Sequence, residues 1–216
     1  MKRLIYVAGV NRKHLAAAAQ EVSAWLLSAT LLRKYPGWID QYMTKNRTVR
    51  WDPGTFSDDP ISYATYRNYL HQHMKSHHTY LQYDEIGDPE ATAYYLKDMR
   101  RRGMQPIPVL QGNAFHLLRQ EPHLAIGGLV RMSDEERRRY LDEVFYDHKP
   151  IGKIHLLGMI QHKWFSPYMA HEGDNTSWIP RSEWNRRKSV DEWLKEYGGQ
   201  WVPHYPRELV QTQLFS

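Results

Sequence analysis

Three aspartates lie where a parallel α/β fold would place its chemistry. Asp52, in VRWDPGTF, and Asp84, in YLQYDEIGDPEAT, close short apolar or β-branched runs, and Asp174, in GDNTSW, closely follows another. In a barrel of parallel strands the carboxyl ends face one common mouth, so we expect the three carboxylates to converge.

Two further segments are expected at the same mouth. Gln111 ends PIPVLQ, and Gly127, Gly128 and Leu129 end LAIGGL. Three carboxylates, an amide and a glycine turn together suit a polar, planar ligand that forms several hydrogen bonds. Each feature also has a plain structural interpretation, as a turn residue, a helix cap, a loop amide or a close-packing glycine.

The elements that must position these residues alternate between strand and helix. Such alternation favours parallel strands joined by right-handed crossovers. We predict an α/β fold, a compact (β/α)8-type (TIM) barrel trimmed to six or seven clear β/α units, and an open doubly wound sheet is the competing topology. The predicted strands span residues 4–8, 48–51, 78–84, 107–111, 124–129 and 153–157, and the predicted helices 14–32, 61–75, 91–102, 114–120, 133–146, 161–169 and 182–197.

Composition narrows the class of protein. The 216 residues are 41% hydrophobic and 13% aromatic, enough for a substantial core, and we expect one domain, 1–216, with an irregular tail from about residue 198. The net charge of +5 permits contact with a polyanion but does not require it. The absence of cysteine excludes disulfides and thiolate zinc sites. No apolar run is long enough for a membrane span, so a cytoplasmic protein is expected.

The motifs resemble, in this order, those of the guanine transglycosylases, the tRNA-guanine transglycosylase superfamily with its phage and bacterial DNA-modifying branch. The resemblance is carried by WDPGTFS, YDEIGDPEAT, PVLQG, IGGLV, and KIHLLGM followed by GDNTSW, between about residues 50 and 181. No single motif is specific, but their order at barrel-strand spacing is the stronger signal.

The resemblance implies a chemistry in which guanine is exchanged for a 7-deazaguanine base at C1′ of its nucleoside. By resemblance, Asp174 would be the nucleophile that traps C1′ and Asp52 the general acid/base. Asp84 would accept hydrogen bonds from N1–H and the 2-amino group of the purine. Gln111 and the Gly128 or Leu129 amides would address O6 and the 7-substituent, Gly127 would lie in the same substrate-binding turn, and Phe56 could stack on the base.

Four departures from the tRNA enzymes favour the DNA-directed branch. The chain has no Cys/His zinc site, has Pro53 where serine is expected, lacks the usual sequence after the nucleophile motif, and is much shorter. The nucleophile is the least secure assignment, because Glu172 lies two residues from Asp174.

Phosphate contacts are expected beyond the third aspartate. Basic residues interleaved with aromatics suit a groove for splayed nucleotides, and the candidates are Trp178, Arg181, Arg186, Arg187 and Lys188. The alternative for the tryptophan is a place in the core. His71 and His73 have metal-like spacing but would point to different sides of a helix, so neither a metal nor another cofactor is expected.

The sequence therefore predicts an enzyme, a transglycosylase with DNA as partner and a preQ0-like 7-deazaguanine as small-molecule substrate, and without a membrane. Three alternatives stay open: the same exchange on tRNA, a non-catalytic nucleic-acid-binding subunit that keeps the fold, and a metal-dependent barrel hydrolase. A homo-oligomer is also open.

Overall fold

The structure, a computed structural model, describes residues 4–10, 24–33, 48–165, 167, 168 and 170–175. Within this part of the chain, eight short strands form one parallel sheet in the order β4-β3-β2-β1-β8-β7-β6-β5. The strands are β1 (Leu4–Val7), β2 (Ala24–Ser28), β3 (Thr48–Asp52), β4 (Thr79–Tyr80), β5 (Val109–Leu110), β6 (His123–Ile126), β7 (Lys153–Leu156) and β8 (Glu172–Asn175).

The sheet is curled, and its first and last strands are neighbours. Tyr6 of β1 pairs with Asp174 of β8. At the two ends of the strand order, Leu81 forms a parallel bridge with Ile107. The Gln82 amide donates to the Ile107 carbonyl at 2.9 Å, and the Ile107 amide donates to the Tyr80 carbonyl at 2.8 Å. This singly wound order is consistent with the predicted TIM-like barrel.

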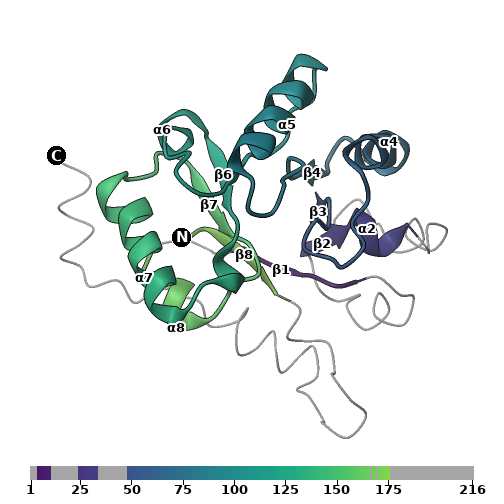
Figure 1. Cartoon of the computed structure of the whole chain (residues 1–216). Coiled ribbons are helices and arrows are strands. Elements are labelled where there is room, and N and C mark those ends of the chain that lie inside the picture. The colour runs from purple at the N-terminus through teal and green to yellow at the C-terminus, as the bar shows by residue number, and fades with distance from the viewer. Residues whose placement is uncertain (1–3, 11–23, 34–47, 166, 169, 176–216) are drawn as a thin grey trace, which may run out of the picture.

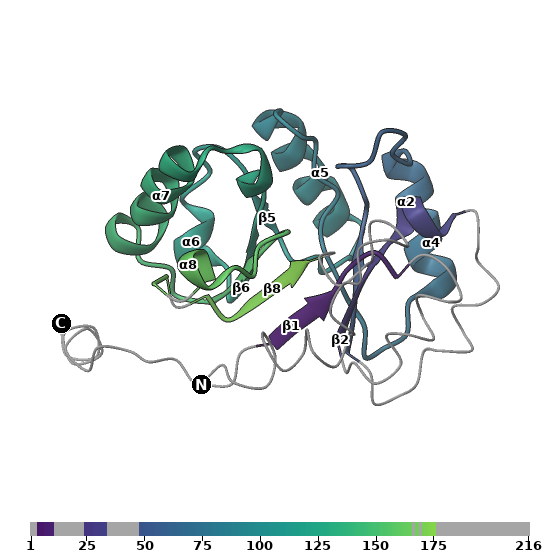
Figure 2. The ribbon, with the colours of Figure 1, turned by 90° about the horizontal axis from the view of Figure 1, so that it is seen from below.

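The described helices lie in an arc around one face of the sheet (Figures 1 and 2). Two of them begin as the sequence predicts: Asp88 caps the helix that starts at Pro89, and Ser133 forms a capping box with Glu136. The helices are α2 (Ala29–Leu32), α4 (Tyr63–His73), α5 (Pro89–Arg101), α6 (Leu117–Gln120), α7 (Asp134–Asp142) and α8 (His162–Phe165), with a 3₁₀ turn η2 (Leu129–Arg131) and a π turn η3 (Glu143–Asp147).

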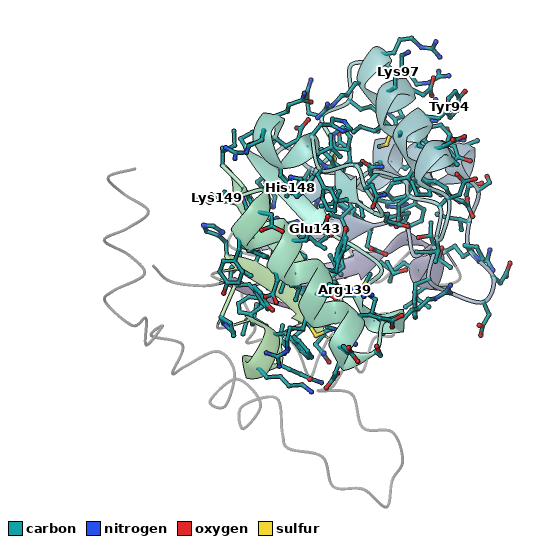
Figure 3. The ribbon with its side chains drawn as sticks, turned by 60° about the vertical axis from the view of Figure 1, so that its left-hand side comes forward. Tyr94, Lys97, Arg139, Glu143, His148 and Lys149 are labelled. Atoms are coloured by element: carbon teal, nitrogen blue, oxygen red, sulfur yellow. The ribbon has the colours of Figure 1, made fainter. Side chains whose placement is uncertain are left out.

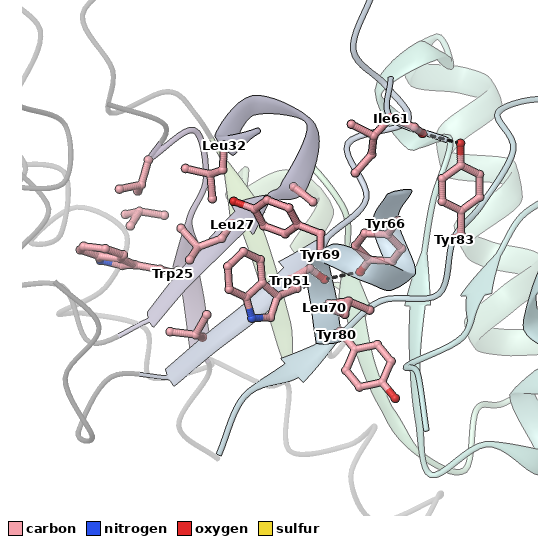
Figure 4. Packing of buried hydrophobic residues seen from close by; sticks show 14 of the residues in the cluster. Trp25, Leu27, Leu32, Trp51, Ile61, Tyr66, Tyr69, Leu70, Tyr80 and Tyr83 are labelled. Carbon is pink, nitrogen blue, oxygen red and sulfur yellow. Dashed lines mark hydrogen bonds between the residues drawn. The ribbon is translucent and has the colours of Figure 1, made fainter. Parts of the chain in front are cut away.

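The two faces of the sheet bury different side chains. Facing the helices, one cluster includes Trp25 and Leu27 of β2, Trp51 of β3, and Tyr66 and Leu70 of α4 (Figure 4). A second cluster on this outer face joins β5, β6 and β7 to α6, α7 and α8. The inner face holds a smaller apolar cluster, made of Tyr6, Ala8, Ala24, Leu26, Leu81, Ile107, Val109 and Ala125. Because side chains alternate along a strand, the residues two positions from these also face inward.

Two strands contradict the prediction of six or seven. Residues 24–28 form β2, although a helix was predicted over 14–32, and residues 172–175 form β8. The AWLLS run has helix propensity, but this preference is weak. As a strand, the run is buried on both of its faces, and this burial outweighs the preference. The EGDN run carries no apolar pattern because Glu172 and Asp174 face other charged groups inside the sheet. The strand predicted over 124–129 ends at Ile126, before a turn at Gly128.

The outer helix faces carry the solvated charges. Tyr94 and Lys97 of α5, and Arg139 and Glu143, point away from the sheet (Figure 3). Among the described helices, none is both long and apolar enough to cross a membrane. The helix predicted over 182–197 and the tail predicted from about residue 198 lie outside the described residues.

Candidate functional site

The three aspartates share one edge of the sheet, which we call the mouth: the edge formed by the carboxyl ends of the strands. Asp52 is the last residue of β3, Asp84 follows the bridge at Leu81, and Asp174 is the third residue of β8. The charges of both Asp84 and Asp174 raise the pKa of Asp52. The mouth therefore brings the three predicted carboxylates within electrostatic reach of one another.

The turn after β3 holds Asp52 in place. Its Oδ1 accepts a hydrogen bond from the Gly54 amide at 2.6 Å. Gly54 has a φ of 77°, and a Cβ at this position would lie 2.3 Å from Ser28 Oγ. The hydroxyl of Thr30 donates to the Pro53 carbonyl at 2.7 Å. Only glycine fits this turn, which ties the Asp52 loop to the end of β2.

Asp52 is an acid that keeps its proton near neutral pH. Burial raises its pKa to about 8, repulsion from Asp84 and Asp174 adds to the shift, and the Gly54 hydrogen bond opposes it. A carboxyl that is protonated at pH 7 and lies beside two other carboxylates has the properties of a general acid.

Asp84 is fixed by two donors. Thr55 Oγ1 donates to its Oδ1 at 2.8 Å, and Gln111 Nε2 donates to its Oδ2 at 2.5 Å. Burial raises the pKa of Asp84, and these two hydrogen bonds oppose that effect. Asp84 and Gln111 thus lie in direct contact, and the same WDPGTF loop that carries Asp52 supplies Thr55.

The backbone around Asp84 is held by a buried amide. Gln82 Oε1 accepts from the Val109 amide at 3.0 Å, and Gln82 Nε2 donates to the Thr92 carbonyl at 3.0 Å. This side chain joins the segment after β4 to β5 and to α5. It sets the direction in which the chain leaves the sheet toward Asp84.

Asp174 receives two hydrogen bonds on one oxygen. His155 Nε2 lies 2.9 Å from its Oδ1, and the Gly158 amide donates to the same atom at 3.0 Å. Within the described part of the chain, Oδ2 has no hydrogen-bond partner. Asp174 is thus a buried carboxylate with one oxygen held by two donors and the other free of hydrogen bonds from the described residues.

Deeper inside the sheet lies an inner charge cluster of Arg50, His123, His155 and Glu172. Arg50 Nη1 donates to Glu172 Oε2 at 2.6 Å and lies 2.6 Å from His155 Nδ1. His123 Nε2 lies 2.9 Å from the same Glu172 oxygen. Burial acts to raise the pKa of Glu172, but the hydrogen bond to His123 and the charge of Arg50 oppose it, and this pKa lies well below its usual range.

The cluster also resolves the positions of the two carboxylates on β8. Glu172 pairs in register with Leu4, near the start of β1, whereas Asp174 pairs with Tyr6, two residues closer to the mouth. The Arg50 guanidinium lies over the Tyr6 ring, 4.6 Å from its centroid. This contact lies between the level of Glu172 and the level of Asp174. Glu172 is engaged with the cluster, and Asp174 is the carboxylate at the mouth.

The glycine turn and the aromatic residue are placed less uniformly. A Cβ on Gly127 would lie 3.0 Å from Val109 and 3.5 Å from Gln111, so this glycine packs against the Gln111 side. Gly128 has a φ of 78° and turns the chain after β6. The Leu129 side chain is buried in the outer core, so only its backbone can face the mouth. Phe56 is 56% exposed, with the Arg131 guanidinium 5.0 Å over its ring.

Sequence reasoning missed Arg50, Thr55, His155 and Gly158, and treated Glu172 only as a rival nucleophile. One signal was present: residues two apart on a strand share a face. Arg50 therefore shares the face of Asp52, and Glu172 that of Asp174. His155 is the polar residue inside the apolar run of KIHLL, where a buried strand needs a reason for it.

The histidines of α4, and His78 after it, pack on aromatic side chains or face solvent. His73 packs on Tyr69 with ring centroids 4.4 Å apart, and His71 is exposed. His78 accepts from Trp51 Nε1 at 3.2 Å, and burial lowers its pKa to about 4. In the residues that the structure describes, no group of three or more His, Asp or Glu side chains has an arrangement that could hold a metal ion.

A cavity lies beside the mouth but not at it. Its volume is about 290 Å³, and it lies between α5 and the segment leading into α6. Gln111 lines it, and none of the three aspartates does. We therefore regard it as a space behind the Gln111 side chain. The predicted nucleic-acid contacts, Trp178, Arg181, Arg186, Arg187 and Lys188, all lie outside the described residues.

No model of a protein family matches the chain, and no curated protein matches it. The assignment of chemistry therefore rests on the residues at the mouth.

Proposed function

We propose that the chain is a compact (β/α)8-type barrel that exchanges guanine in DNA for a 7-deazaguanine base through a covalent Asp174–C1′ intermediate. The observation that carries the proposal is that Asp52 and Asp174 have different environments at the mouth. Asp52 holds a proton near neutral pH, whereas Asp174 accepts hydrogen bonds on one oxygen and leaves the other available.

Two carboxyl groups with different environments suit double displacement at an anomeric carbon. In the first step, Asp174 Oδ2 bonds to C1′ as the bond from C1′ to the guanine nitrogen breaks. Asp52 gives its proton to the departing guanine. In the second step, the incoming base returns a proton to Asp52, its nitrogen bonds to C1′, and the bond to Asp174 breaks. Atoms and charge balance over the two steps.

Recognition of the base falls to Asp84 and Gln111. Asp84 would accept hydrogen bonds from N1–H and the 2-amino group of a guanine-like base, and adenine cannot supply both donors. Its two protein donors, Thr55 and Gln111, hold the carboxylate in one orientation before the base arrives. A buried site built for such donors discriminates against a base that lacks them by several kcal/mol.

DNA as the partner rests on the sequence departures from the tRNA enzymes. An enzyme that reaches C1′ at a base inside a duplex must flip the nucleotide out, at a cost of a few kcal/mol, or act on a single strand. The exposed Phe56 ring and the Arg131 guanidinium at the mouth are suited to stack on a flipped base. The same exchange on tRNA is the alternative partner.

A base-exchange assay tests the proposal. Wild-type protein is incubated with guanine-containing DNA, and separately with tRNA, in the presence of labelled preQ0 or labelled guanine. Asp174→Asn is the matched control, because it keeps the size of the side chain and removes its charge. We expect label to enter DNA with the wild type and not with the variant.

The other outcomes separate the alternatives. Label that enters only tRNA would replace the partner and keep the chemistry. DNA binding without incorporation into either nucleic acid would contradict the catalytic proposal and favour a binding subunit.

A further inference from the structure

His155 is the residue that joins the mouth to the inner charge cluster. It lies on β7, is fully buried, and contacts charged side chains on two other strands. Its Nε2 faces Asp174 of β8, and its Nδ1 faces Arg50 of β3 and, at 3.5 Å, Glu172. The Tyr6 ring of β1 packs beside it, with ring centroids 5.4 Å apart.

Arg50 decides which ring nitrogen carries the proton. A guanidinium has only donors, so an imidazole nitrogen 2.6 Å from Arg50 Nη1 must be the acceptor. Nδ1 is therefore unprotonated, and the proton is on Nε2. An imidazolium is disfavoured because its Nδ1–H would point at the guanidinium. The contact between two strands thus fixes the tautomer of the neutral His155 ring.

We propose that His155 is a positioning residue, which Arg50 holds in the neutral Nε2–H form so that it donates a hydrogen bond to Asp174. The donor occupies Oδ1 together with the Gly158 amide. This arrangement keeps the Asp174 carboxylate in one rotamer and leaves Oδ2 for a reacting carbon. The catalytic benefit rests on the proposed function, whereas the tautomer and the contact do not.

Glu172 orients Arg50 toward His155. Its Oε2 accepts from Arg50 at 2.6 Å, and Arg50 Nε donates to Thr79 Oγ1 at 3.2 Å. The guanidinium is thus oriented by two strands before it meets His155. Asp174 is coupled in this way to residues that contact neither the base nor C1′.

The first test is independent of any reaction. Long-range ¹H–¹⁵N spectra of the ¹⁵N-histidine-labelled wild type at pH 7 report which nitrogen of each imidazole is protonated, and His155→Gln assigns the signals of residue 155. We expect a neutral ring with the proton on Nε2. A proton on Nδ1, or an imidazolium, would overturn the inference, whether or not the protein exchanges bases.

The second test uses two amide replacements. The side-chain amide of Gln reaches the Nε2 position and offers both a donor and an acceptor, whereas that of Asn reaches only the Nδ1 position. We expect His155→Asn to lower kcat of base exchange about tenfold to a hundredfold with KM for the base little changed, and His155→Gln to restore most of it, since one hydrogen bond to a charged group is worth that much. His148→Gln, at a histidine that stacks on Phe115, is the control.

Equal kcat in the Asn and Gln variants would overturn the positioning role. If the wild type performs no exchange at all, the proposed function fails, and the spectra alone decide on the tautomer. Thermal unfolding of both variants separates a general loss of folded protein from a loss of Asp174 positioning.

Discussion

The acidic residues inside the sheet have two opposite kinds of surroundings. In the inner charge cluster, Glu172 is paired with Arg50 and contacts His123. At the mouth, Asp52, Asp84 and Asp174 have donors on neutral groups or a neutral histidine, and no cation pairs with any of them in the described part of the chain. Glu172, Asp84 and Asp174 are buried to a similar extent and Asp52 is half-buried, so the main difference between the two regions is whether a cation pairs with the carboxylate.

The two kinds of surroundings separate a region that contributes to stability from a region suited to chemistry. A buried carboxylate paired with a cation keeps its charge and gains little from a ligand. A buried carboxyl without a cation has a raised pKa, as Asp52 and Asp84 do, and gains from a ligand that supplies donors or accepts a proton. The unpaired carboxyl groups mark the mouth as the candidate site.

Removal of the charge at either carboxylate of β8 should separate the two regions most clearly. Asp174→Asn should reduce base exchange by about four orders of magnitude or more, because it removes the nucleophile. Glu172→Gln should leave covalent trapping of C1′ detectable. Mass spectrometry of denatured protein after incubation with DNA measures the adduct. An adduct that persists in Asp174→Asn and disappears in Glu172→Gln would reverse the two assignments.

The second prediction concerns the paired region. Arg50→Met should destabilise the protein by about 3–5 kcal/mol, because it leaves the buried Glu172 charge without its guanidinium. Chemical denaturation at pH 7 measures the free energy of unfolding. Combining it with Glu172→Met should recover much of the loss, since the pair is then replaced by apolar groups. If the double variant is no more stable than Arg50→Met, the pair contributes more to stability than the neutralisation of one buried charge by the other.

The third prediction concerns recognition at the mouth. Asp84→Asn should weaken binding of guanine by about 1.5–3 kcal/mol, because a neutral amide cannot accept from two base donors as a carboxylate does. Isothermal titration with guanine and with adenine measures the change. The fold should remain, since Thr55 and Gln111 can still bond to the amide. Equal affinity of the wild type for adenine and guanine would argue against the assigned role of Asp84.

The smallest expected effect is a pH dependence of stability that originates at Asp52. Its ordinary pKa is 3.8 and the folded value is about 8, so the folded state holds an extra proton between these values. Stability from this group is full below about pH 4 and is lost as the pH rises toward 8. Asp52→Asn should lack this slope and gain about 1–2 kcal/mol on the wild type between pH 5 and pH 8, because solvent at the mouth weakens the full effect.

Unfolding of both proteins at several pH values measures that difference. Parallel slopes would place the pKa of Asp52 near its ordinary value. In the wild type, base exchange should also decline above about pH 8, where the general acid is ionised.

Local sequence patterns were enough to predict a parallel α/β fold and to place three aspartates at the carboxyl ends of its strands. Short apolar runs ending in turn residues predicted β1, β3, β6 and β7. Asp88-Pro89 and the S-x-x-E box at Ser133 predicted two helix starts, because capping is a local interaction within four residues. Asp84 and Gln111 could be placed together because strand ends in a parallel sheet meet at one edge.

Only the tertiary structure decided that Ala24–Ser28 is a strand, that Glu172–Asn175 is another, and that Arg50, His155 and Glu172 form one cluster. The physical reason is range. Arg50 and Glu172 are separated by 122 residues and His155 and Arg50 by 105, so no local pattern of the chain records their contact. β8 is a polar strand without a hydrophobic pattern. Its buried carboxyl groups are stabilised by ion pairs and hydrogen bonds with side chains on other strands.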